Sequence, residues 1–226
     1  MKDRRLALLF RAGALLFALA GLAKQLGIFG GKTYFSIFMY YTIQSNLLAV
    51  VLFALLILRM ARDQKGGVSE PPQWTSRFGM VCMVDLLVTL VVFWVLLVPT
   101  VDASYLFTFE NIAVHTVTPL LCLVDYFLFA RKGCLKYVDA LYVCIFPLGY
   151  VLFTSIAGLM GYVYSYEQHQ DTMELVPVRF PYFFLDFDRI GIIAALYIAG
   201  ILLFFLLLSH IFYFIDRKGR KRPEKS

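Results

Sequence analysis

Long apolar runs separated by short polar stretches dominate this sequence. Six of the runs are long enough to cross a bilayer, whose hydrocarbon core requires about 20 residues of helix. Together they use most of the chain, which leaves no soluble domain of useful size. The pattern therefore predicts an all-α membrane protein with one domain, 1–226, and six transmembrane helices, at 6–29, 36–60, 78–99, 105–130, 136–163 and 188–215.

Composition supports this interpretation. The 226 residues are 61% hydrophobic and only 16% charged, whereas about 25% of the residues in an average soluble protein are charged. The first apolar run also resembles a signal peptide, because a basic stretch precedes it and Ala18 and Ala20 have the spacing of a cleavage site. The run continues to Phe29, which is longer than an ordinary signal-peptide core. We therefore expect a retained helix, with removal as the alternative.

The distribution of basic residues predicts the orientation. The formal net charge is +6. In a six-span arrangement, all but four of the 21 basic residues lie at one end of the helices, and the four exceptions are Lys24, Lys32, Arg179 and Arg189. Because basic residues concentrate in cytoplasmic segments, both termini are expected in the cytoplasm, in a multi-pass protein of the cell membrane. This distribution explains the charge without a nucleic-acid partner.

The cysteines indicate neither disulfides nor zinc. Cys82, Cys122, Cys134 and Cys144 are expected in the cytoplasmic halves of helices or in a cytoplasmic loop. Disulfides form in oxidising compartments, and the spacing matches no zinc-binding pattern.

The longest outer segment, 164–187, combines acidic residues with an aromatic run at 180–185. Aromatic side chains are enriched at the headgroup level of a membrane. The segment is either an interfacial anchor or a lid over the mouth of the bundle, in which case Phe180, Tyr182 and Phe183 would face the substrate. The first inner loop, 61–76, is predicted to be a turn-rich linker because it contains Gly66-Gly67 and Pro71-Pro72.

Polar residues inside a membrane span are costly and often mark a functional site. Two spans carry such clusters in their outer halves. Helical spacing places Thr42, Ser45, Asn46 and Ala49 on one face of the second span, and Asn111, His115, Thr118 and Cys122 on one face of the fourth. Pro119 lacks the N–H that would bond the carbonyl of His115, so a freed carbonyl and a kink are expected there.

The expected depths in the bilayer indicate that two of these residues, Thr42 and His115, lie near each other. Thr42 is expected roughly 9 Å below the outer end of its helix and His115 roughly 15 Å below its own, at 1.5 Å per residue. A threonine hydroxyl beside a neutral imidazole is a nucleophile–base pair. The alternative is structural, because Ser and Thr in spans also bond their own helix and a single His also joins two helices.

Other ionisable residues leave further alternatives. Asp85 and Asp125 lie in the inner halves of the third and fourth spans, where a proton relay or ion site competes with an ordinary interhelical polar contact. The interhelical contact is the simpler interpretation. His169 lies among acidic residues of the outer loop, where a metal site competes with a solvated acidic loop. No metal is predicted.

Several motifs resemble the androgen-induced family of six-span membrane proteins and its bacterial relatives. They are Tyr41-Thr42-Ile43-Gln44-Ser45-Asn46-Leu47-Leu48, His115-Thr116-Val117-Thr118-Pro119 with Asp125, Pro147-Leu148-Gly149-Tyr150, and Phe180-Pro181-Tyr182-Phe183-Phe184-Leu185-Asp186. The resemblance covers nearly the whole chain. Residues 44–46 are more similar to the bacterial branch than to the animal one.

This resemblance implies a hydrolase of fatty acid esters of hydroxy fatty acids, with Thr42 as nucleophile and His115 as base. We therefore expect a lipid-ester hydrolase that needs no cofactor and whose ligands are membrane lipids, lipid esters or fatty acids. Four polar side chains would support the pair, by donating to the oxyanion or by orienting the imidazole. They are Asn46, Asn111, Gln44 and Ser45. The alternatives are a small transporter or channel and a non-catalytic lipid-binding scaffold.

Overall fold

The computed structural model describes residues 4–30, 35–63, 73–168 and 173–219. It is almost entirely helical, and six helices are long and apolar enough to cross a membrane. The predicted fold class is therefore confirmed. The six spans are Arg4–Gln25, Tyr41–Arg62, Gln73–Thr100, Phe109–Leu128, Asp139–Leu159 and Ile193–Lys218.

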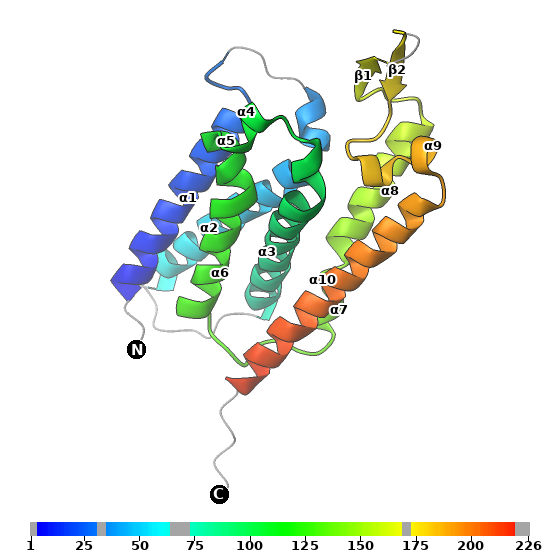
Figure 1. The fold of residues 1–226 in the computed structure, drawn as a ribbon. Helices are drawn as coiled ribbons and strands as arrows, with labels where there is room; N and C mark the ends of the chain where they lie inside the picture. Colours follow the sequence, from blue (N-terminus) through cyan, green and yellow to red (C-terminus); the bar gives the residue numbers. More distant parts are fainter. Residues whose placement is uncertain (1–3, 31–34, 64–72, 169–172, 220–226) are drawn as a thin grey trace, which may run out of the picture.

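The helices form a bundle around the third span (Figure 1). Helix α3 (Gln73–Val92) contacts α2 (Tyr41–Asp63), α6 (Thr118–Leu128) and α10 (Ile193–Lys218), and α1 (Arg4–Gln25) packs against α2 and α6. Buried apolar side chains such as Phe53, Met80 and Phe205 fill the contacts. Helix α1 begins and α10 ends at the same end of the bundle (Figure 1).

Two spans contain a π-helical turn. The third continues from α3 into the turn Phe93–Leu97, and the fourth consists of α5 (Phe109–Ile112), the turn Ala113–Val117 and α6. Such turns are rare and occur often at functional sites. The fifth span is also divided, into α7 (Asp139–Tyr142) and α8 (Ile145–Leu159).

The second span begins later than predicted. A separate 3₁₀ turn occupies Phe35–Met39, and α2 starts at Tyr41 instead of residue 36. The Gln44 side chain donates to the Phe38 carbonyl at 3.0 Å, which fastens this turn to the start of α2. Thr42 is therefore the second residue of its helix, and not six residues inside it.

The other boundaries shift for local reasons. Helix α5 begins at Phe109 because the Thr108 hydroxyl caps its first turn, and a separate short helix, α4 (Ala103–Leu106), precedes it. Gly191 has a φ of +53°, a conformation that glycine adopts easily. It separates α9 (Phe187–Ile190) from α10. The sixth span therefore runs over 193–218, not 188–215.

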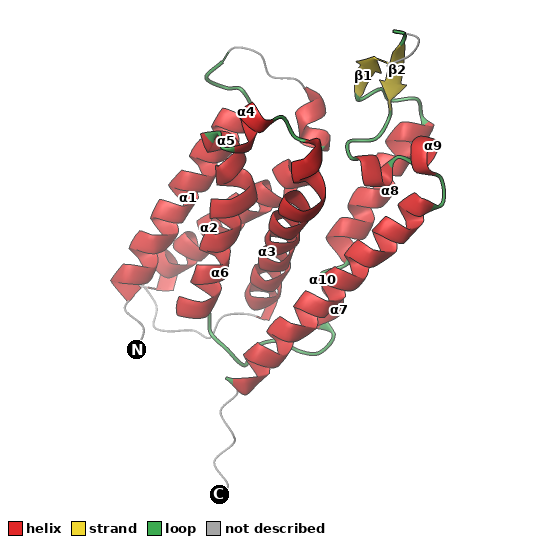
Figure 2. Cartoon of the chain, in the orientation of Figure 1, coloured by secondary structure: helices red, strands yellow, loops and turns green. Residues whose placement is uncertain are grey.

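The segment 164–187 contains a small hairpin that the sequence did not predict. Strands β1 (Ser165–Gln168) and β2 (Leu175–Val178) pair antiparallel, with Ser165 opposite Val178. They form the sheet drawn in yellow in Figure 2. The predicted glycine–proline linker at 66–72 and the candidate metal residue His169 lie outside the described residues.

A buried ion pair joins the first and fourth spans. Arg11 Nε lies 2.7 Å from Asp125 Oδ1, and Arg11 Nη2 lies 3.2 Å from Oδ2. Both side chains are buried, and the two parallel bonds give the pair a fixed geometry. The simpler of the two interpretations of Asp125, an interhelical contact, is therefore confirmed.

Candidate active site

The Thr42 side chain lies at the beginning of α2. Its Oγ1 atom is 3.1 Å from His115 Nε2, and both side chains are buried. The first residues of a helix have N–H groups without an intrahelical acceptor. The Thr42 N–H instead faces the Tyr182 hydroxyl, 3.5 Å away. The contact of 3.1 Å confirms the expected proximity of the Thr42 and His115 side chains.

A backbone carbonyl orients the imidazole. His115 Nδ1 lies 3.1 Å from the carbonyl oxygen of Asn111, one turn earlier. Because a carbonyl only accepts hydrogen bonds, this contact assigns the ring proton to Nδ1. The Nε2 lone pair then faces the Thr42 hydroxyl. This arrangement presents a base to a hydroxyl, as nucleophilic catalysis requires.

The two π-helical turns meet at His115. His115 lies in the turn of the fourth span, and its ring stacks on Phe93, from the turn of the third span, with ring centroids 3.8 Å apart and planes inclined by 19°. Phe93 is also buried. The stacking restricts rotation of the imidazole, so its Nε2 atom is held toward α2.

Close helix packing supports the turn that carries His115. A Cβ atom on Gly21 of α1 would lie 2.7 Å from the Cβ of Ala113, closer than real contacts allow. Only glycine permits α1 to approach the turn to this distance. Gly21 thereby helps to position His115 from outside the site.

Pro119 affects a different carbonyl from the one predicted. In the π-helical register the Thr118 N–H bonds the Ala113 carbonyl, five residues earlier. Residue 119 would bond Val114 in the same register, but proline has no N–H. Asn46 Nδ2 supplies the missing donor, at 2.9 Å from the Val114 carbonyl. The expectation of a freed carbonyl therefore applies to Val114 instead of His115, because the π turn shifts the register by one residue.

The polar neighbours of the pair are bonded to the backbone. Asn46 Nδ2 also donates to the Thr42 carbonyl at 2.8 Å, which joins α2 to the fourth span. Asn111 Nδ2 donates to the Leu106 carbonyl at 2.7 Å. Ser45 Oγ contacts Thr89 Oγ1 at 3.2 Å and bonds the Thr42 carbonyl. Gln44 bonds the Phe38 carbonyl, as described above. These side chains therefore hold the backbone around the site in place. Asn111 contacts the imidazole through its backbone carbonyl and not through its side chain.

The aromatic run at 180–185 packs into the bundle. Phe180 and Tyr182 are buried, whereas Phe183 is 38% exposed. The Tyr182 ring stacks on Phe184, with centroids 5.0 Å apart, and meets Tyr40 edge to face. This places the Tyr182 hydroxyl directly over the start of α2. Sequence reasoning selected Tyr182 only as a lid residue and missed the contact of its hydroxyl with Thr42.

Two cavities of different character meet at Thr42. One, of about 700 Å³, has a mixed lining, in which apolar side chains stand beside polar groups such as Gln25, Tyr105, Arg189 and His115. The other is a narrow slot of about 70 Å³ between α3, α8 and α10, and its wall is almost entirely apolar. Thr42, Leu97 and Tyr182 line both cavities. The hydroxyl of Thr42 is therefore at the junction of a larger chamber with mixed lining and an apolar slot.

The remaining ionisable candidates lie apart from this pair. Asp85 Oδ1 accepts a hydrogen bond from the Tyr41 hydroxyl at 2.9 Å, and its Oδ2 has no partner among the described residues. The other described histidine, His210, is also distant from the pair along the chain, and its Nδ1 lies 2.7 Å from the Leu206 carbonyl of its own helix. Among residues 4–30, 35–63, 73–168 and 173–219, no three His, Cys, Asp or Glu side chains are grouped as metal ligands.

Comparison with known proteins identifies no relative. No protein-family model matches the chain, and no curated protein or solved structure is similar to it.

Proposed function

We propose that this protein is an intramembrane hydrolase of lipid esters, with Thr42 as nucleophile and His115 as general base. The observation that carries the proposal is the 3.1 Å contact between Thr42 Oγ1 and His115 Nε2. It is supported by the Asn111 carbonyl, which leaves Nε2 as the acceptor. The family resemblance of the sequence implies the same two residues.

In the acylation half of the reaction, His115 Nε2 takes the proton of the Thr42 hydroxyl while Oγ1 attacks the ester carbonyl carbon. The tetrahedral intermediate collapses and its bond to the alcohol oxygen breaks. The imidazolium then gives its Nε2 proton to that oxygen. The alcohol leaves, and the acyl group remains as an ester of Thr42.

In the deacylation half, a water molecule takes the place of the alcohol. His115 Nε2 removes one proton from it, and its oxygen attacks the acyl carbon. When the bond to Oγ1 breaks, the imidazolium returns a proton to Thr42. The products are a fatty acid and an alcohol. The cycle uses no cofactor.

Two donors at the start of α2 are placed to stabilise the oxyanion of both intermediates. They are the Thr42 N–H, which has no backbone acceptor in its helix, and the Tyr182 hydroxyl, 3.5 Å from that nitrogen. Burial raises the pKa of Tyr182 to about 12, so the phenol keeps its proton at neutral pH. The positive end of the helix dipole favours negative charge at the same point. A developing oxyanion between the two groups would replace their long mutual contact with two short hydrogen bonds.

The two cavities suggest how a lipid ester binds. The apolar slot lies next to Thr42 and, at about 70 Å³, accepts the first few carbons of an acyl chain. The larger chamber, whose lining includes polar groups, accepts the other part of the ester and the attacking water. The scissile carbonyl then lies at the junction, within reach of Oγ1. Esters with an apolar acyl chain are therefore the expected substrate class.

A transporter or channel is the main competing function. On the face of α2 below the larger chamber, Ser45, Asn46 and Ala49 are fully buried. This packing favours an enzyme over a conducting path. The test uses purified protein in detergent and in liposomes. Release of fatty acid from long-chain esters, without protein-dependent flux of ions or fatty acid, supports the hydrolase, and flux without hydrolysis contradicts it.

We also propose that both termini are cytoplasmic and that the protein resides in the cell membrane. The basis is the concentration of basic residues at the end where α1 begins and α10 ends. A reporter fused after Ser226 should then read cytoplasmic, and one inserted near Gln170, outside the described residues, should read external. An external signal from the C-terminal fusion would overturn the orientation.

A further inference from the structure

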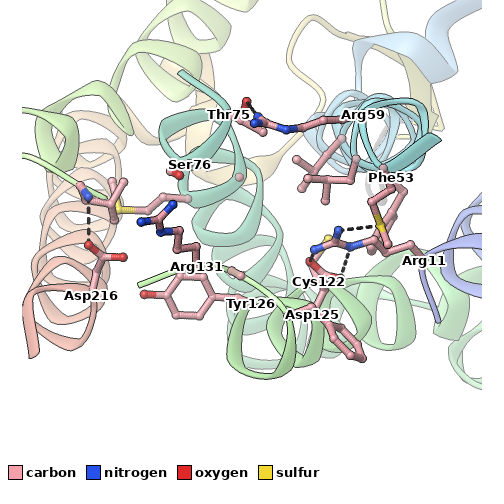
Figure 3. A pocket seen from close by; sticks show the side chains of 18 residues that line it. Arg11, Phe53, Arg59, Thr75, Ser76, Cys122, Asp125, Tyr126, Arg131 and Asp216 are labelled. Carbon is pink, nitrogen blue, oxygen red and sulfur yellow. Dashed lines mark hydrogen bonds and ion pairs between the residues drawn. The ribbon is translucent and has the colours of Figure 1, made fainter. Parts of the chain in front are cut away.

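The larger chamber at Thr42 receives the alcohol part of the ester, because the slot on the other side of Thr42 is apolar. Figure 3 shows another cavity with polar groups in its wall, among them Arg11, Ser76 and Asp125. Thr42 does not line that cavity, so it is not the site of a group bonded to the scissile carbonyl. The wall of the larger chamber therefore determines which alcohols fit.

Charged side chains from two segments form part of this wall. Glu167 belongs to β1, Arg189 to α9, and Asp186 directly precedes α9. Arg189 Nη1 lies 2.8 Å from Glu167 Oε2, and Arg189 Nε lies 3.3 Å from Asp186 Oδ2. The side chains of Glu167 and Arg189 are 59% and 43% exposed. These two charged groups are therefore hydrated.

A hydrocarbon chain is a poor match for this part of the wall. It would displace water from Glu167 and Arg189 without offering hydrogen bonds in return. Such a loss of hydration costs free energy for any polar group, and the cost is largest for charged groups. A hydroxylated alcohol replaces the lost water, because each hydroxyl both donates and accepts hydrogen bonds.

An anionic alcohol is disfavoured by the charges of the wall. The described residues that line the chamber include two carboxylates, Glu167 and Asp186, and one guanidinium, Arg189. Both carboxylates contact that guanidinium, so its positive charge is balanced and one negative charge is left over. This charge repels a phosphate or a carboxylate. A neutral hydroxyl instead donates to a carboxylate oxygen, in a hydrogen bond that the charge strengthens.

We propose that the alcohol part of the substrate is a neutral polyol, of which glycerol is the simplest. This inference rests on the proposed ester hydrolysis and specifies its substrate. The bond from the acyl carbon to a polyol oxygen breaks, and that oxygen takes the proton from His115 Nε2. The remaining hydroxyls of the polyol donate to the chamber carboxylates. A polyol differs from the hydroxy fatty acid that the family resemblance implies.

The test measures kcat/KM of the full chain, purified in neutral detergent, for four esters of oleic acid. They are 1-monooleoylglycerol, its 3-phosphate, methyl oleate and the oleic ester of 12-hydroxystearic acid. The four share the acyl group and differ only in the alcohol. We expect monooleoylglycerol to exceed each of the others about tenfold, as one or two additional hydrogen bonds provide. Methyl oleate, whose alcohol has no further hydroxyl, reports ester hydrolysis without polyol recognition.

Two amide variants change the charge of the chamber in opposite directions. The ratio of kcat/KM for monooleoylglycerol to that for its 3-phosphate should fall about threefold in Glu167→Gln and rise about threefold in Arg189→Gln. Asp188→Asn is the matched control, because Asp188 also belongs to α9 but pairs with Arg179 and does not line the chamber. It should keep the wild-type ratio. Partial misfolding of a variant cancels, since both substrates are measured on one preparation.

Failure of this inference differs from failure of the proposed function. Hydrolysis of none of the four esters would overturn both. Hydrolysis of methyl oleate as fast as that of monooleoylglycerol would overturn the polyol and leave the hydrolase intact. A higher kcat/KM for the 3-phosphate or for the hydroxystearate ester would also overturn it, in favour of an anionic alcohol. Equal changes of the ratio in Glu167→Gln and Asp188→Asn would contradict recognition by the chamber wall.

Discussion

Replacing Thr42 with alanine or valine should reduce the hydrolysis of a long-chain ester on the order of 10⁴-fold. Both variants remove the nucleophilic oxygen that lies 3.1 Å from His115 Nε2. Valine keeps the branched shape, so its packing at the start of α2 is nearly unchanged. His115→Ala should lose a similar factor because the hydroxyl then has no base. The measurement is fatty acid release per purified molecule.

The double variant separates a catalytic unit from two independent residues. Loss of either member of a nucleophile–base pair disables the same step, so the effects are far from additive. Thr42→Ala with His115→Ala should therefore be scarcely less active than either single variant. Thr42→Ser, which keeps a hydroxyl, should retain measurable turnover. Multiplicative losses in the double variant would indicate two separate structural effects.

Replacing Tyr182 with phenylalanine should lower kcat about 10²–10³-fold with little change in KM. This is the range for the loss of one oxyanion donor, and the selective effect on kcat follows because the bond strengthens only in the transition state. The ring remains, so its stacking on Phe184 and its place in the cavity wall are preserved. The measurement is a full substrate-saturation curve for each variant.

Tyr105 provides the matched control for Tyr182. It lines the same chamber, but its hydroxyl donates to Gln25 Oε1 at 2.8 Å, away from Thr42. Tyr105→Phe should therefore keep a kcat close to that of the wild type. If both tyrosine variants lose kcat equally, the loss reflects the chamber as a whole. If Tyr182→Phe keeps full kcat while Thr42→Ala is inactive, the oxyanion assignment alone is wrong.

The number of spans could be predicted from the sequence because each bilayer crossing requires a long apolar run. The boundaries were less accurate, because apolar residues continue into short turns. At residues 35–39, the apolar run extends into a 3₁₀ turn before α2 begins at Tyr41. The N–H of Thr42 therefore has no acceptor within its helix. This is the basis of the proposal that it donates to the oxyanion.

The pairing of Thr42 with His115 followed from helical spacing and depth, which are local properties. The π-helical turn between Ala113 and Val117 did not, because it depends on contacts between helices. It shifts the carbonyl affected by Pro119 from His115 to Val114, which accepts the Asn46 amide. A single sequence shows where the proline lies, but it does not show the hydrogen-bond register of the turn that precedes it.

The position of Tyr182 was beyond sequence reasoning for a similar reason. It lies 140 positions from Thr42 along the chain. Nothing local determines how a long connecting segment folds back on a bundle. The strands β1 and β2, which organise that segment, also lacked a clear pattern. The aromatic run indicated that the segment meets the bundle, but not which hydroxyl approaches the nucleophile.

Covalent labelling tests the nucleophile most directly. The purified protein is treated with a long-chain fluorophosphonate, which phosphorylates an activated hydroxyl, and the modified peptide is identified by mass spectrometry. We predict a single adduct on Thr42 that forms together with loss of ester hydrolysis and is absent from Thr42→Val and His115→Ala. No adduct on Thr42 in a protein that hydrolyses long-chain esters would contradict the assignment of Thr42 as the nucleophile.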